Sequence, residues 1–399
     1  MLLTRLFSLT LLYLTFIYAF SPLPDSHTCY LPLTLQSLHI QNPSRETLLG
    51  AIKTPGVSLR TAQPKSPSIR LGYITPWNGR SYDLSKWHAS KFTHISPVWY
   101  QLSVEYNKEP QLNGRHDVHE SWLKDIKTTS NPPKIVPRVQ IQFSQKAAEA
   151  ILYFPQGEIE LIVEVLLREV QQFGYDGLTL ELPHPHAFKS LIEIIGEELH
   201  DIGKELILVV PPIHDPDQAD IAFKAEHVRE LEDAVDYFSV MTYDHSVSLG
   251  VEGPNAPLRW MRQVVEGLID DEDEDEDLWE DAEIDESGDG PISKKSRASK
   301  ILLGLPFYGY KLSKSKGLEA YTASNYVEFL STHKDIIFQW DEVSKEHRMI
   351  ANIGKEDVSI LWYLSLLSLL YRLQLAEEMG VGIAIWELGQ GLDQFFDVL

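Results

Sequence analysis

From residue 71 onward, short apolar runs alternate with longer segments whose apolar residues recur at helical spacing. Several of the short runs carry apolar side chains on both faces, as strands buried in a parallel sheet do. The eight runs lie at 71–74, 92–100, 134–142, 177–182, 206–211, 235–243, 301–308 and 381–386. The clearest amphipathic segments between them lie at 158–173, 188–199 and 363–379.

Eight strands that alternate with helices predict an α/β fold, a (β/α)8 TIM barrel, because parallel neighbours need crossover helices between them. The predicted barrel takes up residues 71–399. The stretch from 311 to about 357 is long for a loop between a strand and a helix. We therefore expect a small insertion between strands seven and eight, over the mouth of the barrel.

The first 20 residues have the pattern of a signal peptide. Arg5 precedes an apolar run over 6–20, which is 15 residues long, whereas a membrane span needs about 20. An uncleaved anchor is the second interpretation. Residues 21–70, rich in Pro, Ser and Thr, are expected to form an N-terminal arm. The chain is thus predicted to be secreted, or to reside in the secretory pathway or a vacuolar or lysosomal lumen, with no further membrane span.

The net charge of −23 is concentrated in one segment. Between Asp270 and Gly290 there are 14 acidic residues and no basic one, so the rest of the chain carries −9. So dense a run of like charges cannot pack, and residues 267–297 are predicted to be a disordered acidic insertion. Because no cluster of Lys and Arg is present, a nucleic-acid partner is not expected.

The sequence offers little for a metal or another cofactor, and we expect none. Cys29 is the one cysteine, so neither an intrachain disulfide nor a cysteine metal site can form. His184 and His186 could bind a metal only with a third ligand, which the sequence does not present.

Aromatic and acidic residues gather at the carboxyl ends of the predicted strands, where barrel proteins carry their sites. Aromatic faces stack on the C–H faces of sugar rings, and carboxylates bind hydroxyl and amide groups. Any one of these aromatics alone is more often ordinary core. Together they predict a sugar site made of Tyr73, Trp77, Trp99, Glu181, Met241, Tyr243, Asp244, Tyr308, Trp386 and Glu387.

Seven segments within residues 71–399 resemble the family-18 glycoside hydrolases, the chitinases, and in particular their chitinase-like lectins. They read LGYITPWNGRSYD, KFTHISPVWYQL, YDGLTLEL, FSVMTYDHS, GPNAPLRW, SKILLGLPFYGY and IAIWELGQGLDQFFDVL. The resemblance implies that chitin or another amino-sugar oligosaccharide is the partner. It also implies that Tyr243 and Asp244 hold the acetamido sugar and that Trp386 forms the floor of the central subsite.

The catalytic strand of that family reads Asp-Gly-x-Asp-x-Asp-x-Glu, and its Glu is the general acid. In this chain Asp176 is retained, Thr179 and Glu181 replace the two inner aspartates, and Pro183 replaces the Glu. Proline has no side-chain proton to donate. Glu181 lies two residues, about 6.6 Å, deeper along the strand, whereas a general acid must come within about 3.2 Å of the leaving oxygen. The segment PRVQ at 137–140 stands where the family has Ser-x-Gly-Gly.

Three functions remain open. The first is a secreted protein that binds amino-sugar oligosaccharides without cleaving them. The second is a weak or unusual glycosidase, acting on N-acetylglucosamine polymers through Glu181, Asp244 or Glu387. The third is a scaffold that presents its outer surface or its acidic insertion to a protein partner. The proline at 183 disfavours the second, and the retained Tyr243, Asp244 and Trp386 favour the first over the third.

Deletion of residues 270–290 is expected to leave the melting temperature within a few degrees of that of the full chain, because a solvated insertion contributes little packing. Thermal unfolding of the two proteins followed by circular dichroism measures this. A loss of about 3 kcal/mol or more would show instead that the segment is structural.

Overall fold

The computed structural model describes residues 44–53, 68–153, 157–212, 222–269, 294–353 and 357–399. The predicted signal peptide, most of the N-terminal arm and the acid tract at 270–293 lie outside these residues. In the described ranges, no helix combines the length and the apolar character needed to cross a membrane.

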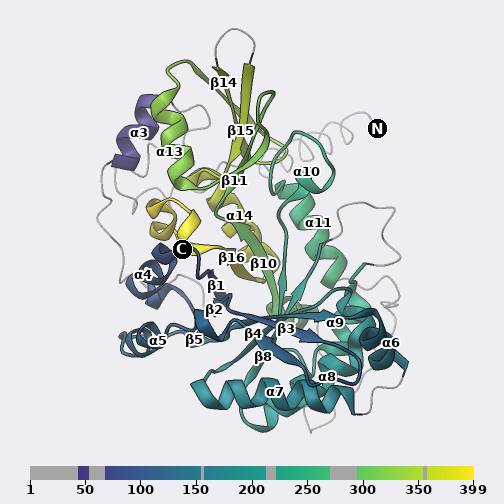
Figure 1. Cartoon of the computed structure of the whole chain (residues 1–399). Helices are drawn as coiled ribbons and strands as arrows, with labels where there is room; N and C mark the ends of the chain where they lie inside the picture. Colours follow the sequence, from purple (N-terminus) through teal and green to yellow (C-terminus); the bar gives the residue numbers. More distant parts are fainter. Residues whose placement is uncertain (1–43, 54–67, 154–156, 213–221, 270–293, 354–356) are drawn as a thin grey trace, which may run out of the picture.

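Parallel strands close into a barrel, as the sequence predicts (Figure 1). The barrel strands are β1 (Arg70–Ile74), β2 (His94–Pro97), β3 (Tyr100–Val104), β5 (Lys134–Ile135), β6 (Arg138–Phe143), β7 (Gly177–Glu181), β8 (Glu205–Val210), β9 (Tyr237–Val240), β10 (Ile301–Pro306) and β16 (Gly382–Trp386). The strands expected at 92–100 and 134–142 are each interrupted, as β2 with β3 and as β5 with β6. The ring closes because β2 pairs with β5 and β3 pairs with β6.

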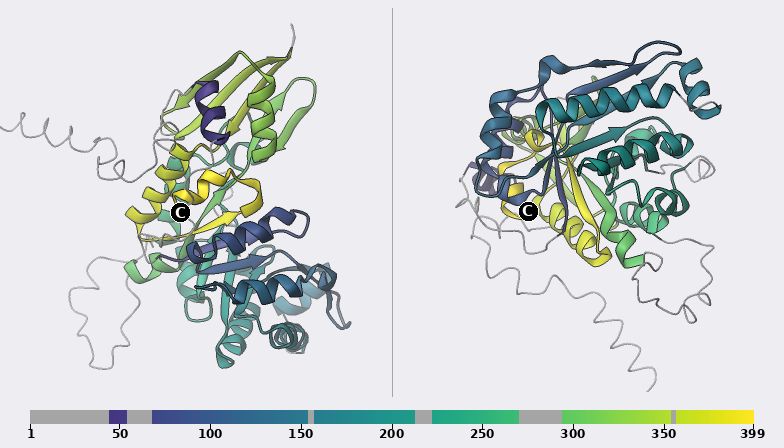
Figure 2. Two further views of the ribbon diagram at one scale, coloured as in Figure 1. Left: turned by 90° about the vertical axis from the view of Figure 1, so that its left-hand side faces the viewer. Right: turned by 90° about the horizontal axis from the view of Figure 1, so that it is seen from below.

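Helices form the layer outside the strands, as the view from below shows (Figure 2). They are α4 (Gly79–Trp87), α5 (Glu120–Lys127), α6 (Gln145–Tyr153), α7 (Glu158–Phe173), α8 (Lys189–Asp201), α9 (Ala225–Leu231), α11 (Leu258–Ile269), α12 (Lys294–Lys300) and α14 (Leu366–Met379). Shorter elements are β4 (Gln111–Asn113), α10 (His245–Ser248), η3 (Ala89–Lys91), η4 (Arg115–Asp117), η5 (Pro185–Phe188), η8 (Leu388–Gln390) and η9 (Asp393–Asp397). The two ends of the insertion predicted at 267–297 are therefore helical, in α11 and α12.

The helix α7 shows how the apolar pattern builds this layer. Its buried side chains, among them Ile159, Ile162 and Leu166, recur three or four residues apart and so share one face of the helix. The helix ends at Gly174, whose φ of 62° is a left-handed conformation that glycine adopts without a Cβ clash.

Inside the ring, apolar side chains from several strands form a second core. Its buried members are Leu71, Tyr73, Val98, Val136, Ile207, Leu302 and Ala384, with Trp386 packed against them. The barrel interior is thus filled, as in other barrels of this type, and a ligand can be bound at its end but not within it.

The insertion predicted between strands seven and eight is confirmed as a small antiparallel lobe at 309–363 (Figure 1). In spatial order its strands are β12 (Gly317–Tyr321), β11 (Gly309–Ser313), β15 (Asp357–Tyr363), β14 (Glu346–Ile353) and β13 (Ile336–Asp341). The helix α13 (Ala323–Thr332) covers one face, with the Tyr326 ring stacked on Tyr363 at 4.4 Å. From the N-terminal arm, α3 (Arg45–Lys53) packs on α13, and the Arg45 Nε donates to the Leu330 carbonyl at 2.5 Å.

A fully buried ion pair joins the lobe to the barrel. The Arg372 Nη2 on α14 lies 2.7 Å from the Glu346 Oε1 on β14, and neither side chain is exposed. Arg372 also donates to the Ala256 carbonyl at 2.5 Å, while Glu346 accepts the Ala256 N–H at 2.9 Å. Because each charged group has several partners, the cost of taking the two charges out of water is offset.

Replacing one member of this pair is expected to be strongly destabilising. Arg372→Met should lower the free energy of unfolding by about 3–5 kcal/mol, because Glu346 is left as a buried, uncompensated charge. Urea denaturation of Arg372→Met, Glu346→Leu and the double variant measures this, and the double variant should cost less than the sum of the single changes. Arg348→Met, which removes the partly exposed Arg348–Glu252 pair, serves as the control and should cost about 1 kcal/mol or less. Strictly additive losses would contradict the coupling.

Candidate functional site

The carboxyl-terminal end of the barrel, hereafter the mouth, brings together aromatic residues from the first and last strands. The ring centroids of Tyr73 and Trp386 are 5.3 Å apart, and the rings are tilted by 53°. The Tyr73 hydroxyl lies 2.9 Å from the Ser239 Oγ on β9. Tyr73 is buried whereas Trp386 is partly exposed, so the indole is the ring available for stacking.

Asp244 is a carboxylate at the mouth that two tyrosine hydroxyls hold in place. The hydroxyls of Tyr308 and Tyr310 both donate to its Oδ1, the latter at 2.8 Å. Its φ of 61° is left-handed, and its backbone N–H donates to the Asn255 Oδ1 at 2.8 Å. The Asn255 side chain in turn donates to the Tyr308 carbonyl at 3.1 Å. The sequence analysis missed Tyr310, although its position two residues after Tyr308 is the spacing of side chains on one face of a strand.

Tyr243 packs beside the Tyr308 ring, at a centroid distance of 6.3 Å. Burial raises the pKa of the Tyr243 hydroxyl well above its usual value, and nearby Tyr73, Asp244 and Glu181 raise it further. The tyrosine is therefore a neutral hydrogen-bonding group. Its place depends on Gly304, because a Cβ there would lie 2.2 Å from the Val240 carbonyl and 3.0 Å from the Tyr243 ring.

Glu181, at the end of β7, is held by two side chains from β6. The Arg138 Nε lies 2.5 Å from the Glu181 Oε2, and the Gln140 Nε2 donates to the Glu181 Oε1 at 3.1 Å. All three side chains are partly buried. Arg138 and Gln140 were not predicted as site residues, although their alternation within PRVQ places both on one face of the strand.

The other positions of the altered catalytic motif have local structural partners. The Thr179 hydroxyl donates to the Val136 carbonyl at 3.0 Å and accepts from the Ser96 hydroxyl at 3.1 Å. The Asp176 Oδ2 accepts the Ile135 N–H at 2.8 Å, at the opposite end of the strand from the mouth. Pro183 is exposed and lies beyond the last residue of β7.

Two predicted site residues do not reach the mouth. Trp99 is buried among the outer helices, where its Nε1 donates to the Tyr82 hydroxyl at 2.7 Å. Glu387 is buried and accepts from the Asn78 Nδ2 at 2.6 Å and from the Gly389 N–H at 3.0 Å.

The last two predicted residues flank the mouth in different ways. Trp77 follows β1 and is 69% exposed, so its ring is accessible. Met241 is partly buried against the core, and its backbone N–H donates to the Val210 carbonyl at 3.0 Å.

His184 and His186, which follow β7, lie near a third histidine that the sequence does not suggest. The His186 ring lies 5.1 Å from that of His227 on α9 and 6.1 Å from that of His184. Desolvation lowers the pKa of His186 and of His227, so burial favours their neutral forms. Across the described part of the chain, no group of three or more His, Cys, Asp or Glu side chains is placed to hold a metal ion.

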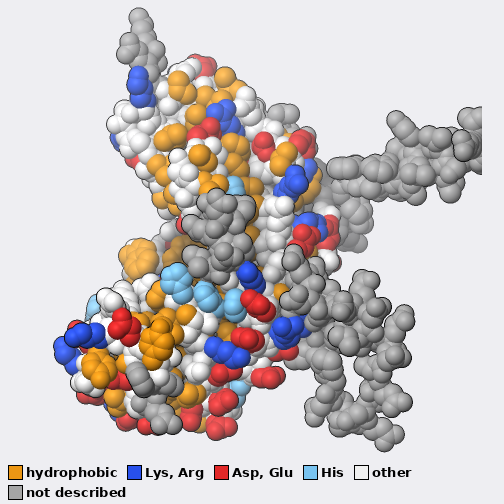
Figure 3. All heavy atoms as spheres, turned by 90° about the vertical axis from the view of Figure 1, so that its right-hand side faces the viewer, with side chains coloured by type: hydrophobic (Ala, Val, Ile, Leu, Met, Phe, Trp, Pro, Cys, Tyr) orange, Lys and Arg blue, Asp and Glu red, His pale blue; other side chains and the backbone are white. Residues whose placement is uncertain are grey.

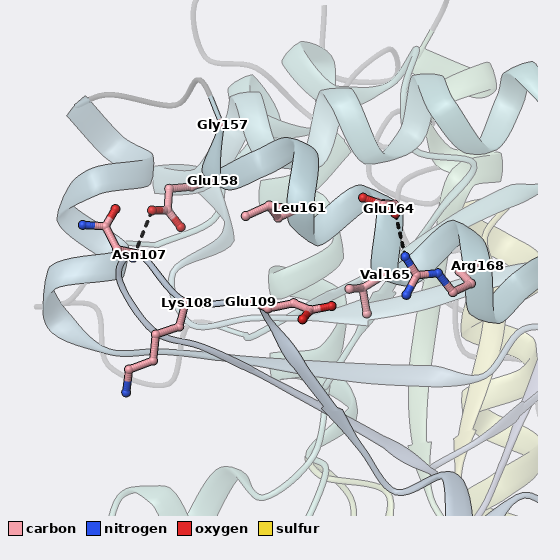
Figure 4. A pocket seen from close by; sticks show the side chains of 9 residues that line it. All are labelled: Asn107, Lys108, Glu109, Gly157, Glu158, Leu161, Glu164, Val165 and Arg168. Atoms are coloured by element: carbon pink, nitrogen blue, oxygen red, sulfur yellow. Dashed lines mark hydrogen bonds and ion pairs between the residues drawn. The ribbon is translucent and has the colours of Figure 1, made fainter.

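A hollow of about 590 Å³ lies outside the barrel, between the turn after β3 and the helix α7 (Figure 4). Glu164 and Arg168 form an ion pair along its wall, and Asn107, Lys108 and Glu109 border it from the turn. None of the predicted site residues lines this hollow. It is separate from the candidate sugar site.

Comparison with known proteins shows that the chain is similar to chitinases. A family model described as glycosyl hydrolases family 18 matches residues 155–391. Chitotriosidase-1 of Mus musculus is 26% identical over 167 residues, which are 38% of this chain and 33% of that protein. The chain thus matches about a third of the length of this curated relative.

Solved chitinase structures have the same fold. The chitinase from Chromobacterium violaceum matches with a TM-score of 0.65 at 18% identity, over 83% of this chain and 97% of that one. A family-18 chitinase from Cycas revoluta, solved in complex with (GlcNAc)3, matches with a TM-score of 0.61 at 16% identity, over 82% and 97%. At identities this low, the two matches show that the fold is shared and nothing more. The family model, in contrast, matches more than half of the residues, and the chain therefore belongs to the glycosyl hydrolases of family 18.

Proposed function

We propose that the mouth of the barrel binds chitin-type N-acetylglucosamine oligosaccharides and does not cleave them, as in the chitinase-like lectins. The observation that carries this proposal is the contrast between two halves of the mouth. Asp244 with Tyr308 and Tyr310, and Trp386 with Tyr73, form an ordered binding half. The half that would supply the acid has an exposed proline at 183 and a carboxylate, Glu181, in an ion pair.

The binding half suits an acetamido sugar. Trp386 offers a ring face for the C–H side of a pyranose, and the Asp244 carboxylate can accept from an amide N–H or a hydroxyl. Tyr308 and Tyr310 donate to only one of its two oxygens, the Oδ1. The Asp244 Oδ2 is thus the oxygen that we assign to the ligand.

A general acid needs a proton to donate at the working pH and access to the leaving oxygen. Both carboxylate oxygens of Glu181 already accept hydrogen bonds, from Arg138 and from Gln140, so this side chain is held away from a leaving oxygen. Glu387 is held in a different way. Burial raises its pKa to about 7, but the side chain is enclosed and bonded to Asn78 and Gly389. Neither carboxyl meets both requirements.

Loss of the stacking ring should weaken sugar binding, in a variant that circular dichroism shows to be folded. Trp386→Ala is expected to raise the dissociation constant for an N-acetylglucosamine oligomer by about 10- to 100-fold, which corresponds to about 1–3 kcal/mol. Isothermal titration with oligomers of increasing length measures this. Trp87→Ala, which removes a half-exposed indole on α4, is the matched control and should bind as the native chain does.

The same oligomers, analysed for shorter products after incubation, test the absence of cleavage. General acid catalysis contributes roughly 100- to 10,000-fold, so the native chain should stay near background. Robust turnover that is abolished by Glu181→Gln would overturn the proposal and show that the chain is a glycosidase.

The raised pKa of Glu387 gives a separate test of its structural role. Because the folded state binds this proton more tightly than the unfolded chain, stability should increase as the pH falls through about 7 toward about 4.5. The free energy of unfolding of the native chain relative to Glu387→Gln should therefore rise by roughly 3 kcal/mol between about pH 8 and about pH 5. A constant difference between the two proteins over this range, measured by urea denaturation, would contradict the assignment.

A further inference from the structure

We propose that three histidines at the rim of the mouth form a pH-sensitive contact, which holds the turn after β7 against the helix α9 at neutral pH and releases it in mildly acidic solution. They are His184, just before η5, His186 within η5, and His227 on α9, hereafter the histidine cluster. The inference is independent of what the mouth binds. It rests on how the three rings meet and on the form of imidazole that their surroundings require.

The histidine cluster joins two segments that are far apart in the sequence. The His186 ring is 5.1 Å from the His227 ring and tilted to it by 32°, and it meets the His184 ring nearly edge-on at 6.1 Å. The turn η5 follows the carboxyl end of β7, and α9 begins after β8, so both segments start on the mouth side of the barrel. Figure 3, which views the side where α6 and α9 lie in Figure 1, shows histidine side chains gathered at the surface.

His227 can make its hydrogen bond only as a neutral ring. Its Nδ1 accepts the backbone N–H of Lys224 at 2.9 Å, across the first turn of α9. A backbone N–H can only donate, so this nitrogen carries no hydrogen, whereas both nitrogens of a protonated imidazole do. Protonation therefore breaks the bond and places a positive charge at the amino end of a helix, where the helix dipole disfavours it.

His186 has no acceptor for an additional proton. The side chain is partly buried, and its Nδ1 is shielded from solvent and has no hydrogen-bond partner among the described residues. In the protonated ring this nitrogen would be a charged donor that is buried and unpaired, which is costly. Once His227 is charged as well, two positive rings would lie 5.1 Å apart and repel each other.

Acidic groups near the histidine cluster offset these costs only in part. The Glu226 Oε1 lies 3.6 Å from the His227 Nε2, beyond hydrogen-bond distance, and the Glu226 side chain is 50% exposed. Glu230 also favours a charged His227, but Lys189 on α8 lies 3.5 Å from it, and Lys224 acts in the opposite direction. The helices α6 and α11 pack against η5 and α9, and no charge on their described residues is among the groups that shift the pKa of either ring.

The pKa values follow from this geometry. Desolvation lowers the pKa of His186, and the charges of His227 and His184 lower it further. Desolvation also lowers the pKa of His227, against the opposite effect of Glu226 and Glu230. The unfolded chain therefore binds these protons more tightly than the folded one. The stability that the histidine cluster contributes is present above about pH 6.5 and is lost as the pH falls from there through the folded pKa values.

The change is expected to be local, because other contacts fix both ends of the turn. Before it, Glu181 is paired with Arg138, and after it the Phe188 ring stacks on Phe143 at 4.7 Å. Between these points His184 has a left-handed φ of 48°, a conformation that a residue other than glycine keeps only where its surroundings hold it. Loss of the ring contacts therefore lets residues 184–187 relax without opening the barrel.

Hydrogen–deuterium exchange of the full chain at about pH 7.5 and about pH 5.5, which lie on either side of the usual histidine pKa, tests the proposal. Protection is expressed relative to the intrinsic exchange rate at each pH. It should fall at the acidic pH by about 10-fold in residues 184–190 and 224–231, which corresponds to about 1.4 kcal/mol. Residues 158–173, in α7, are the internal reference and should keep their protection.

Variants assign the response to the histidine cluster. His186→Phe keeps a ring that cannot be charged, and His227→Gln keeps an acceptor that can receive the same backbone bond. The double variant should show equal protection at both pH values, and each single variant should show part of the native loss. His116→Gln, which removes a histidine that is 82% exposed, is the matched control and should respond as the native chain does.

Circular dichroism at both pH values checks that each variant is folded. Equal protection of the native chain at both pH values, a folded double variant that loses protection as the native chain does, or a His116→Gln chain without the response would each overturn the proposal. If the double variant does not fold, single variants that both respond in full would overturn it as well.

Discussion

The ordered half of the mouth depends on the buried Arg372–Glu346 pair. Glu346 accepts the N–H groups of Asn255 and Ala256, and Asn255 holds both the backbone of Asp244 and the carbonyl of Tyr308. The position of the Asp244 carboxylate therefore depends on an ion pair between the lobe and the last barrel helix. A buried pair contributes less through its own attraction than through the single arrangement of neighbours that satisfies it. The lobe is thus part of the framework of the site.

The departures from the family's catalytic strand fit one another. A neutral, hydrogen-bonded Thr179 stands where the family's strand has one inner acid. Glu181 keeps a carboxylate near the mouth, where burial would be costly without a counter-ion, and Arg138 from the neighbouring strand provides it. Together with Pro183, these residues are consistent with the binding function proposed above, which needs no proton transfer.

The sequence predicted the barrel well because the apolar spacing typical of strands and helices recurs along the chain. The direction in which an individual side chain points depends instead on where its strand bends. Adjacent residues of a regular strand face opposite sides, so Trp386 can face the mouth only if Glu387 turns away. Asp244 does not follow this alternation, because its backbone is left-handed. Trp99 lies at the break between β2 and β3, which no local pattern marks. The sequence shows that residue 138 is an arginine. Its role as the ion-pair partner of Glu181 becomes clear only when the two strands are seen to be neighbours.

The insertion of the lobe also bears on how the barrel closes during folding. Strands β10 and β16 are neighbours in the ring although residues 307–381 separate them, and closing so long a loop is entropically costly. The pairing of β11 with β15 brings the two ends of the lobe together soon after β10 ends. A lobe that folds early would convert a distant strand pair into a near one, lowering the effective contact order of the final closure. In this view the lobe holds β10 and β16 near each other while the ring closes.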